Sequence, residues 1–329
     1  MKMRRLFLEE KAVFGGDTMA KISTREAYGR ALVELGRQDE RVVVLDADLS
    51  KSTKTEYFAK EFPDRFFNMG IAEQSLMGTA AGLALGGKIP FASTFAVFAT
   101  GRAFDQVRNS IAYPRLNVKI AATHAGITVG EDGASHQSVE DLALMRAIPN
   151  MTVLVPADAV EARQAVFAAA KYEGPVYLRL GRMNVPVIYG EDYRFEIGRA
   201  HWLKKGRDVT IIACGVMVAL ALEASRDLEG EGLSIGVLNM STLKPLDKEA
   251  VLTVAQESKA LVTAEEHSII GGLGSAVAEV LAEEHPKPLK RIGIPDTFGE
   301  SGTPDELMLK YGLTVEDIKK AVREVLLQK

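Results

Sequence analysis

A single carboxylate, that of Glu73, stands at the start of a predicted helix otherwise built from small and apolar residues, within the segment 68–78 (NMGIAEQSLMG). Residues 75–86 are all Ser, Thr, Gly, Ala, Leu or Met, a composition that lets another backbone or a flat ligand approach closely. A carboxylate is costly to bury alone, and apolar surroundings favour its protonated form. Glu73 is therefore a candidate for proton exchange with a heterocycle, the alternative being a helix N-terminal glutamate with no further role.

Two aromatic residues, Phe95 and Phe98, lie three positions apart at the end of a predicted strand. At this spacing they can share a face and form an apolar floor on which a flat ring stacks. Taken alone, the pair is more typical of a hydrophobic core. Its place between Glu73 and the histidine-rich loop that follows favours a binding surface.

A glycine-rich loop, residues 124–137, carries His124, Glu131, Asp132 and His136 directly after a predicted strand. Ligand sites in parallel sheets lie beyond the carboxyl ends of strands, so this loop is positioned for binding. The spacing matches no helical or finger-type zinc pattern, and we expect no metal ligand in this chain. Imidazoles and carboxylates supply the donors, acceptors and proton shuttles that a polyhydroxylated sugar requires.

Read together, these segments resemble the pyrimidine-binding domain of thiamine diphosphate enzymes. The resemblance rests on residues 70–74 (GIAEQ), 91–98 (FASTFAVF) and 121–137 (AATHAGITVGEDGASHQ), and the set of His124, Asp132 and His136 resembles transketolase in particular. Residues 297–306 (TFGESGTPDE) also resemble the last domain of transketolase. The resemblance runs from about Ile22 to the C-terminus, and the joint pattern is far more specific than any one motif.

The resemblance implies thiamine diphosphate as the cofactor. The Glu73 carboxylate would hydrogen-bond a ring nitrogen of the aminopyrimidine and so promote the imino tautomer that deprotonates the thiazolium carbon. Phe95 and Phe98 would form the floor under the pyrimidine, and Asp48 would lie near the cofactor at a subunit junction. Many transketolases carry a third aromatic one turn further on, where this chain has Gly101, so the pocket is either more open or filled by another residue.

The resemblance also implies the substrates, a ketose phosphate that donates a two-carbon ketol unit and an aldose phosphate that accepts it. His124 would contact the first hydroxyls of the donor ketose, and His136 the reacting hydroxyl region, which makes both candidate catalytic residues beside Glu73. Asp132 would contact the hydroxyl next to the carbonyl of the acceptor aldose. The reaction belongs to pentose phosphate metabolism.

Three separated residues match phosphate-site motifs of transketolase. They are Arg25 in STRE, Ser52 in DADLSKS and Arg182 in LRLGRMN, and the fork of an arginine suits phosphate oxygens. Arg179 lies close by in sequence, but the motif selects Arg182. Alone, each arginine is more typical of a surface charge.

One motif is missing. Thiamine diphosphate enzymes hold Mg²⁺ and the diphosphate through Gly-Asp-Gly followed by an Asn pair, and no such segment occurs in this chain. The chain therefore resembles the C-terminal subunit of a split transketolase. We expect the Mg²⁺ ligands on a partner N-terminal subunit, joined to this chain in an α2β2 heterotetramer, with the small-residue face of residues 78–86 at a subunit contact.

Composition narrows the class of protein. The 329 residues contain 40 Lys and Arg against 44 Asp and Glu, a net charge of −4, with no run of one sign that would favour nucleic acid or a membrane surface. The single cysteine, Cys214, excludes an internal disulfide and favours a reducing compartment. No unbroken apolar stretch reaches spanning length. These features predict a cytoplasmic protein whose partners are small molecules and other proteins.

Short β-branched runs alternate with helical patterns throughout, which predicts an α/β protein with two parallel-sheet domains. We expect strands at residues 41–45, 65–68, 89–93, 118–123, 152–155, 176–180, 209–213, 234–238, 260–263 and 290–293. We expect helices at residues 24–36, 54–62, 73–85, 102–111, 139–146, 159–173, 217–228, 248–257 and 274–283, with two more near the C-terminus.

The periodicity divides the chain into four parts. Residues 1–18 are expected to form a disordered or loosely attached extension, and residues 19–181 the pyrimidine-binding domain. Residues 182–207, rich in Gly and Pro, are expected to be a linker before a transketolase C-terminal domain at 208–329.

Other functions stay open at this point. The GIAEQ segment also suits deoxyxylulose phosphate synthase and the beta subunit of 2-oxo acid dehydrogenases, although the synthase commonly has Asp-Arg where this chain has Thr123-His124. A non-catalytic binding module with the same fold is a further alternative. A neighbouring gene with the Gly-Asp-Gly and Asn-Asn pattern would favour the enzyme.

Overall fold

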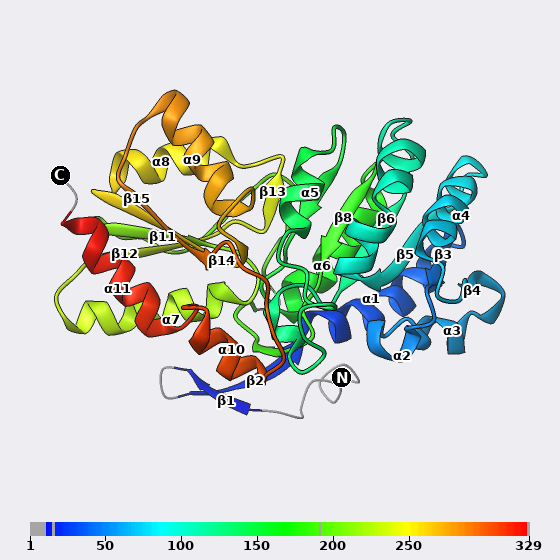
Figure 1. Cartoon of the computed structure of the whole chain (residues 1–329), viewed down its shortest axis with the longest axis horizontal. Coiled ribbons are helices and arrows are strands. Elements are labelled where there is room, and N and C mark those ends of the chain that lie inside the picture. The colour runs from blue at the N-terminus through cyan, green and yellow to red at the C-terminus, as the bar shows by residue number, and fades with distance from the viewer. Residues whose placement is uncertain (1–10, 15–16, 191, 328–329) are drawn as a thin grey trace.

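The computed structural model describes residues 11–14, 17–190 and 192–327. The first part of the chain supplies six strands of a seven-stranded sheet of order β13-β7-β8-β6-β5-β3-β4, and β13 (Thr242–Lys244) comes from the second part (Figure 1). Six strands of this sheet pair in parallel: β3 (Val42–Asp46), β4 (Phe66–Asn68), β5 (Ile89–Phe95), β6 (Lys119–Thr123), β7 (Thr152–Leu154) and β8 (Val176–Arg179). Every residue of β3, β5 and β6 is buried, because helices cover both faces of the sheet.

Two groups of helices provide this cover, and alternate residues of β3 face each group. Val42 and Val44 belong to one hydrophobic cluster, and Val43 and Leu45 to the other. The first cluster includes residues of α1 (Thr24–Gln38) and α6 (Ala159–Lys171). The second includes residues of α4 (Glu73–Leu85), α5 (Asp141–Ala147) and the π-helical turns η3 (Phe98–Arg102) and η4 (Gln106–Ala112).

Two predicted helices differ from the structure. The helix predicted over 54–62 is shorter, as α3 (Glu56–Glu61), and is preceded by a short helix that was not predicted, α2 (Ser50–Thr53), which ends where Lys54 has a left-handed φ of 70°. The helix predicted over 102–111 is replaced by η3 and η4, whose hydrogen bonds span five residues. Two short 3₁₀ turns complete this part, η2 (Pro63–Arg65) and η5 (Ile127–Val129).

The second part of the chain forms a five-stranded sheet of order β10-β12-β11-β14-β15 (Figure 1). Its parallel strands are β11 (Val209–Ala213), β12 (Ile235–Asn239), β14 (Ala260–Ser268) and β15 (Leu289–Ile294), with β10 (His201–Lys204) as an antiparallel edge. Residues of α7 (Met217–Gly230) and α11 (Val315–Leu326) lie in one cluster of this lobe, and residues of α8 (Lys248–Glu257) and α9 (Leu273–Glu284) in another. A short helix, α10 (Pro304–Lys310), packs against η5 of the first lobe.

The two lobes share core and sheet. The cluster that includes Leu76 of α4 and Leu142 of α5 continues to Val251 of α8 and Val277 of α9. Strand β13 (Thr242–Lys244) leaves the second lobe and pairs antiparallel with β7, Thr242 opposite Leu154. The lobes therefore share a hydrophobic cluster and, through β13, one sheet.

The predicted α/β class with two largely parallel sheets is confirmed, whereas several short antiparallel strands were not predicted. Residues predicted as linker contain β9 (Asn184–Pro186) and β10, and β13 was not predicted. Of the predicted extension, residues 1–10 and 15–16 lie outside the described residues. Strand β1 (Lys11–Phe14) pairs with β2 (Asp17–Ser23), and β2 pairs with β9.

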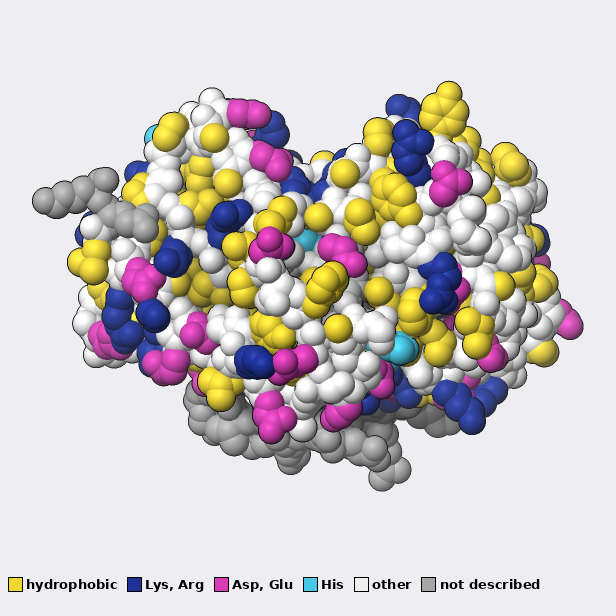
Figure 2. All heavy atoms as spheres, viewed as in Figure 1, with side chains coloured by type: hydrophobic (Ala, Val, Ile, Leu, Met, Phe, Trp, Pro, Cys, Tyr) yellow, Lys and Arg dark blue, Asp and Glu magenta, His cyan; other side chains and the backbone are white. Residues whose placement is uncertain are grey.

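The face shown in Figure 2 mixes apolar side chains with charges of both signs, and its upper edge is notched between the lobes. Among the described residues, no helix combines the length and apolar character that crossing a membrane requires.

Candidate active site

Glu73 is the first residue of α4, as predicted, and its side chain is 2% exposed. Its surroundings are not the uninterrupted apolar wall that the sequence suggested. One terminal nitrogen of Arg102 donates to both carboxylate oxygens, at 3.1 and 3.0 Å. The guanidinium also lies over the Phe98 ring, 4.6 Å from its centroid, and the arginine side chain is half exposed. Glu73 is thus a buried carboxylate held by a cation that has access to solvent.

Arg102 is a site residue that sequence reasoning missed. It follows Gly101, where a third aromatic was expected, and a β-carbon on Gly101 would meet no atom within 4 Å. Arg102 covers the Phe98 ring through a cation–π contact. The only sequence signal for an unusual residue here was the lack of an aromatic at Gly101, and that signal did not indicate Arg102.

Four rings predicted to form the site come together at the carboxyl ends of β5 and β6. Phe95 and Phe98 are nearly parallel, with centroids 6.0 Å apart and an angle of 9°. His124 stacks on Phe95 at 3.8 Å, and the ring of His136 stands edge-on to Phe98 at 5.4 Å. The phenylalanines therefore belong to a cluster that includes the loop histidines rather than to the hydrophobic core alone.

His124 is held in one tautomer. Its φ of 56° is left-handed, and the side chain is 3% exposed. A terminal nitrogen of Arg25 lies 3.2 Å from Nε2, and because arginine only donates, Nε2 is the acceptor. Nδ1 then carries the proton and donates to the Thr123 hydroxyl at 2.8 Å. Burial, and next the charge of Arg25, lower the pKa of His124 to about 3, so the imidazole is neutral.

Positive charge gathers around this histidine. Arg25 donates to the backbone carbonyl of Ser52 at 2.9 Å, and its buried Nε has no partner among the described residues. Burial, followed by the charge of Arg182, lowers the pKa of Arg25. Arg182 donates to the backbone carbonyl of Val129 and, at 3.4 Å, to the exposed carboxylate of Glu131. Two cations held close together, one with an unused donor, are what an anionic group binds to.

Asp132 and Asp48, two further predicted site residues, are both exposed. Asp132 is exposed in the turn that follows η5. Asp48, also exposed, has a left-handed φ of 64° and follows β3. The Asn68 amide binds it twice, accepting from its backbone N–H and donating to its carboxylate, both at 3.1 Å. Both side chains are therefore accessible to a molecule that approaches from solvent, although the Asp48 carboxylate already accepts a hydrogen bond from Asn68.

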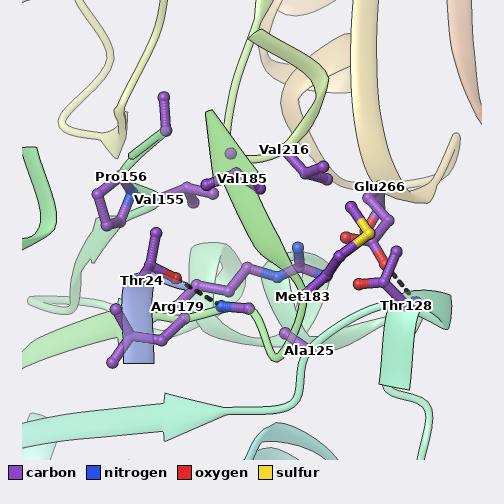
Figure 3. A pocket seen from close by; sticks show the side chains of 14 residues that line it. Thr24, Ala125, Thr128, Val155, Pro156, Arg179, Met183, Val185, Val216 and Glu266 are labelled. Atoms are coloured by element: carbon purple, nitrogen blue, oxygen red, sulfur yellow. Dashed lines mark hydrogen bonds between the residues drawn. The ribbon is translucent and has the colours of Figure 1, made fainter. Parts of the chain in front are cut away.

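A separate narrow pocket lies at the junction of the lobes, beside the loop 124–137 (Figure 3). Arg179 enters it but is fully engaged. Its side chain donates to both carboxylate oxygens of Asp141, at 2.7 and 3.0 Å, and to the backbone carbonyl of Glu266 at 2.9 Å. Arg179 is therefore structural, whereas Arg182 is not bound to a buried carboxylate. Within the described residues, no group of three or more His, Cys, Asp or Glu side chains is arranged to hold a metal ion.

Comparison with known families identifies the two parts of the chain. Residues 20–187 match the pyrimidine binding domain of transketolase, and residues 198–318 match the transketolase C-terminal domain. The chain belongs to the transketolase family. It corresponds to the C-terminal half of the family's full-length members: human transketolase is 39% identical over 307 residues, which are 92% of this chain and 49% of the human protein.

Other members of the transketolase family match nearly end to end. A solved structure described as a split gene transketolase in an inactive beta4 tetramer is 63% identical, with a TM-score of 0.88 over 93% of this chain and 98% of that chain. A Methanocaldococcus jannaschii protein, assigned by its name to a transketolase C-terminal section, is 54% identical over 91% of this chain and 95% of its own length. The 6-deoxy-6-sulfo-D-fructose transketolase subunit SqwH of a Clostridium species is 46% identical over 92% of this chain and 94% of its own length.

Proposed function

We propose that this chain is the C-terminal subunit of a thiamine diphosphate-dependent transketolase that moves a two-carbon ketol unit from a ketose phosphate to an aldose phosphate. The observation that carries the proposal is the convergence of Glu73, the parallel rings of Phe95 and Phe98, and the neutral imidazole of His124. A buried carboxylate beside flat apolar rings suits a nitrogen heterocycle, and the imidazole next to it suits the hydroxyls of a sugar.

Thiamine diphosphate, when bound, supplies a thiazolium carbon that its own aminopyrimidine deprotonates. Glu73 would accept a hydrogen bond from the pyrimidine ring and favour the imino tautomer, while Phe95 and Phe98 support the ring. Arg102 holds both oxygens of Glu73, and its half-exposed side chain is free to turn outward and release them.

The sugar would be held by the histidines and the cations. His124 keeps its proton on Nδ1, so the hydroxyls of the donor ketose would compete with Arg25 for Nε2. Arg25 and Arg182, with Ser52, would bind the anionic end of the substrate. The name of the relative SqwH includes a sulfonated sugar, and an arginine fork accepts a sulfonate as well as a phosphate. His136 and Asp132 would complete the contacts to the reacting region and to the acceptor.

A partner N-terminal subunit would complete the cofactor site. The Gly-Asp-Gly and Asn-pair motif that binds Mg²⁺ and diphosphate is not in this sequence, so those ligands would come from the partner. We propose a cytoplasmic α2β2 assembly with the cofactor at each unlike interface. One face of α4 fits such a contact, since β-carbons on Gly78 and Gly82 would meet no atom within 4 Å and Leu85 is 76% exposed. A relative described as an inactive beta4 tetramer agrees with a requirement for another subunit.

The proposal is tested by titrating thiamine diphosphate and Mg²⁺ into the purified chain, alone and mixed with a neighbouring gene product that carries the Gly-Asp-Gly motif. We expect weak binding and no ketol transfer from the chain alone, and tight binding with full activity from the mixture. Full activity from the chain alone would overturn the two-subunit assignment. A mixture that binds the cofactor without transferring a ketol unit from any sugar would contradict the proposed transketolase reaction.

A further inference from the structure

The loop 124–137 has its conformation fixed by side chains and backbone of the other lobe. The Thr128 backbone N–H, in η5, donates to a carboxylate oxygen of Glu266, on β14, at 2.7 Å. Glu266 is 4% exposed and lies 138 residues away in sequence. Figure 3 shows this hydrogen bond at the edge of the pocket between the lobes. A buried carboxylate that accepts from a backbone amide makes a strong, directional contact.

Glycines in the loop let the second lobe approach this closely. Gly126 has a φ of 80°, and a β-carbon there would lie 2.2 Å from a carboxylate oxygen of Glu266. Gly133 has a φ of 74°, and a β-carbon there would lie 2.7 Å from the Ser301 hydroxyl. Any larger residue at either position would clash as well as strain the backbone. The two glycines thus suit a loop pressed against another surface.

A second anchor lies at the end of the loop. The Gln137 amide group donates to the backbone carbonyl of Glu300 at 2.8 Å and to that of Gly130 at 3.1 Å. Gln137 also fills the space beside Gly299, where a β-carbon would collide with its side-chain oxygen. Residues 299–301 belong to the TFGESGTPDE segment, to which the proposed reaction assigns no role. This segment therefore lies under the loop that carries His124 and His136.

From these contacts we propose that the C-terminal lobe is the template for the substrate loop 124–137, with Glu266 as its positioning residue and Gln137 as a second anchor. Glu266 touches neither the aromatic rings nor the cationic cluster, so its effect on substrate passes through the loop. The inference rests on the proposed function only where it concerns sugar binding. The shaping of the loop stands on the contacts themselves.

Hydrogen exchange of the full chain, followed by mass spectrometry, tests the shaping directly. Glu266→Ala should speed exchange in peptides from residues 124–137 by roughly tenfold or more, because the loop loses its charge-assisted contact. Glu266→Gln, which keeps an acceptor oxygen for Thr128, should restore most of the protection. Gln137→Ala should speed exchange at the end of the loop and offers a second reading if Glu266→Ala folds poorly.

Glu265 provides the matched control, because it is the adjacent residue of β14 and is also buried. Its carboxylate accepts from the backbone N–H groups of Leu273 and Gly274, at 2.7 and 2.8 Å, inside its own lobe. Glu265→Ala should therefore speed exchange at the start of α9 and leave the loop protected. A loop that opens equally in the Glu265 and Glu266 variants, or in neither, would overturn the proposal.

Steady-state kinetics of the reconstituted enzyme link the loop to substrate. Glu266→Ala should raise KM for the sugar phosphates about tenfold or more, beyond any effect of Glu265→Ala, because small displacements of binding groups are costly. A loop that opens without a change in KM supports the shaping by Glu266 and contradicts the proposed sugar-binding role of the loop. A raised KM with unchanged exchange contradicts the shaping.

Discussion

Arg179 and Arg182 lie three residues apart, yet their surroundings differ in a way that separates structure from binding. Burial lowers the pKa of Arg179, but the charge and hydrogen bonds of Asp141, together with the charges of Glu266 and Tyr177, raise it by more, so the pKa is raised overall and the pair stays ionised. The phenol of Tyr177 donates a further hydrogen bond to Asp141 at 2.7 Å. The buried Asp141 carboxylate therefore accepts three hydrogen bonds, two from Arg179 and one from Tyr177.

The region around Arg182 and Arg25, by contrast, has a hydrogen-bond donor without an acceptor. Arg182 is paired at 3.4 Å with the exposed carboxylate of Glu131 rather than with a buried one, and the pKa of Arg25 is lowered by burial and by Arg182. Its Nε is buried without a partner among the described residues. A buried donor without an acceptor costs free energy that an anion would recover. The comparison teaches that an arginine in a closed network holds the fold, whereas an arginine short of acceptors indicates a ligand.

The largest expected effect breaks the closed network. Arg179→Ala should lower the free energy of unfolding by about 3–5 kcal/mol, because Asp141 is left as an uncompensated buried charge. Chemical denaturation measures this change. Arg182→Ala is the matched control and should change stability by less than about 1 kcal/mol, since the Arg182 side chain is 36% exposed. Similar losses in both variants would contradict the distinction between the two regions.

The open network is tested through substrate. Arg25→Ala and Arg182→Ala should each lower kcat/KM for phosphorylated or sulfonated sugars. The loss should correspond to about 1.5–3 kcal/mol of binding free energy, the range of a charge-assisted contact. Hydroxypyruvate, which lacks a distal anion, should be nearly unaffected. Steady-state kinetics with the two kinds of donor give the ratio. Equal losses for both donors would make these arginines structural.

A smaller effect concerns the imidazole between the two regions. With its folded pKa near 3, His124 resists protonation that the unfolded chain accepts near pH 6.5, so its contribution to stability is present above pH 6.5 and is lost as pH falls toward 3. Between pH 7 and pH 5 this loss amounts to about 2 kcal/mol. The His124→Asn substitution suits the left-handed backbone. Between pH 7 and pH 5 this variant should lose about 2 kcal/mol less stability than the wild-type protein. Denaturant titrations at the two pH values that show equal losses for both proteins would contradict a buried neutral imidazole.

The sequence predicted what depends on local pattern. The helix that starts at Glu73 and ends at Leu85 was placed correctly, because its composition and flanking glycines are local signals. The pairing of β13 with β7 was missed, since its three residues carry too little pattern and the partner strand lies far away in sequence. The contact between Glu73 and Arg102 was missed for the same reason, because it spans 29 residues and depends on a π-helical turn.

Candidate site residues divide in the same way. Motif resemblance selected Phe95, Phe98, His124 and His136, and the structure brings their rings together. Their proposed roles remain predictions. Glu266 could not have been found from sequence, because its partner Thr128 is 138 residues away and Glu266 itself lies outside the segments that carry the resemblance. Contacts between lobes are set by tertiary packing, which no local pattern encodes.

The most direct test of the proposed function is proton–deuterium exchange at the thiazolium carbon of thiamine diphosphate in the reconstituted complex. Glu73→Gln keeps the size of the side chain but cannot drive the imino tautomer, so the exchange rate should fall by at least about a hundredfold with folding intact. Glu34→Gln, in a surface ion pair with Arg163, is the control and should exchange at the wild-type rate. An unchanged exchange rate in the Glu73 variant would remove this carboxylate from the mechanism and contradict the assignment of the site.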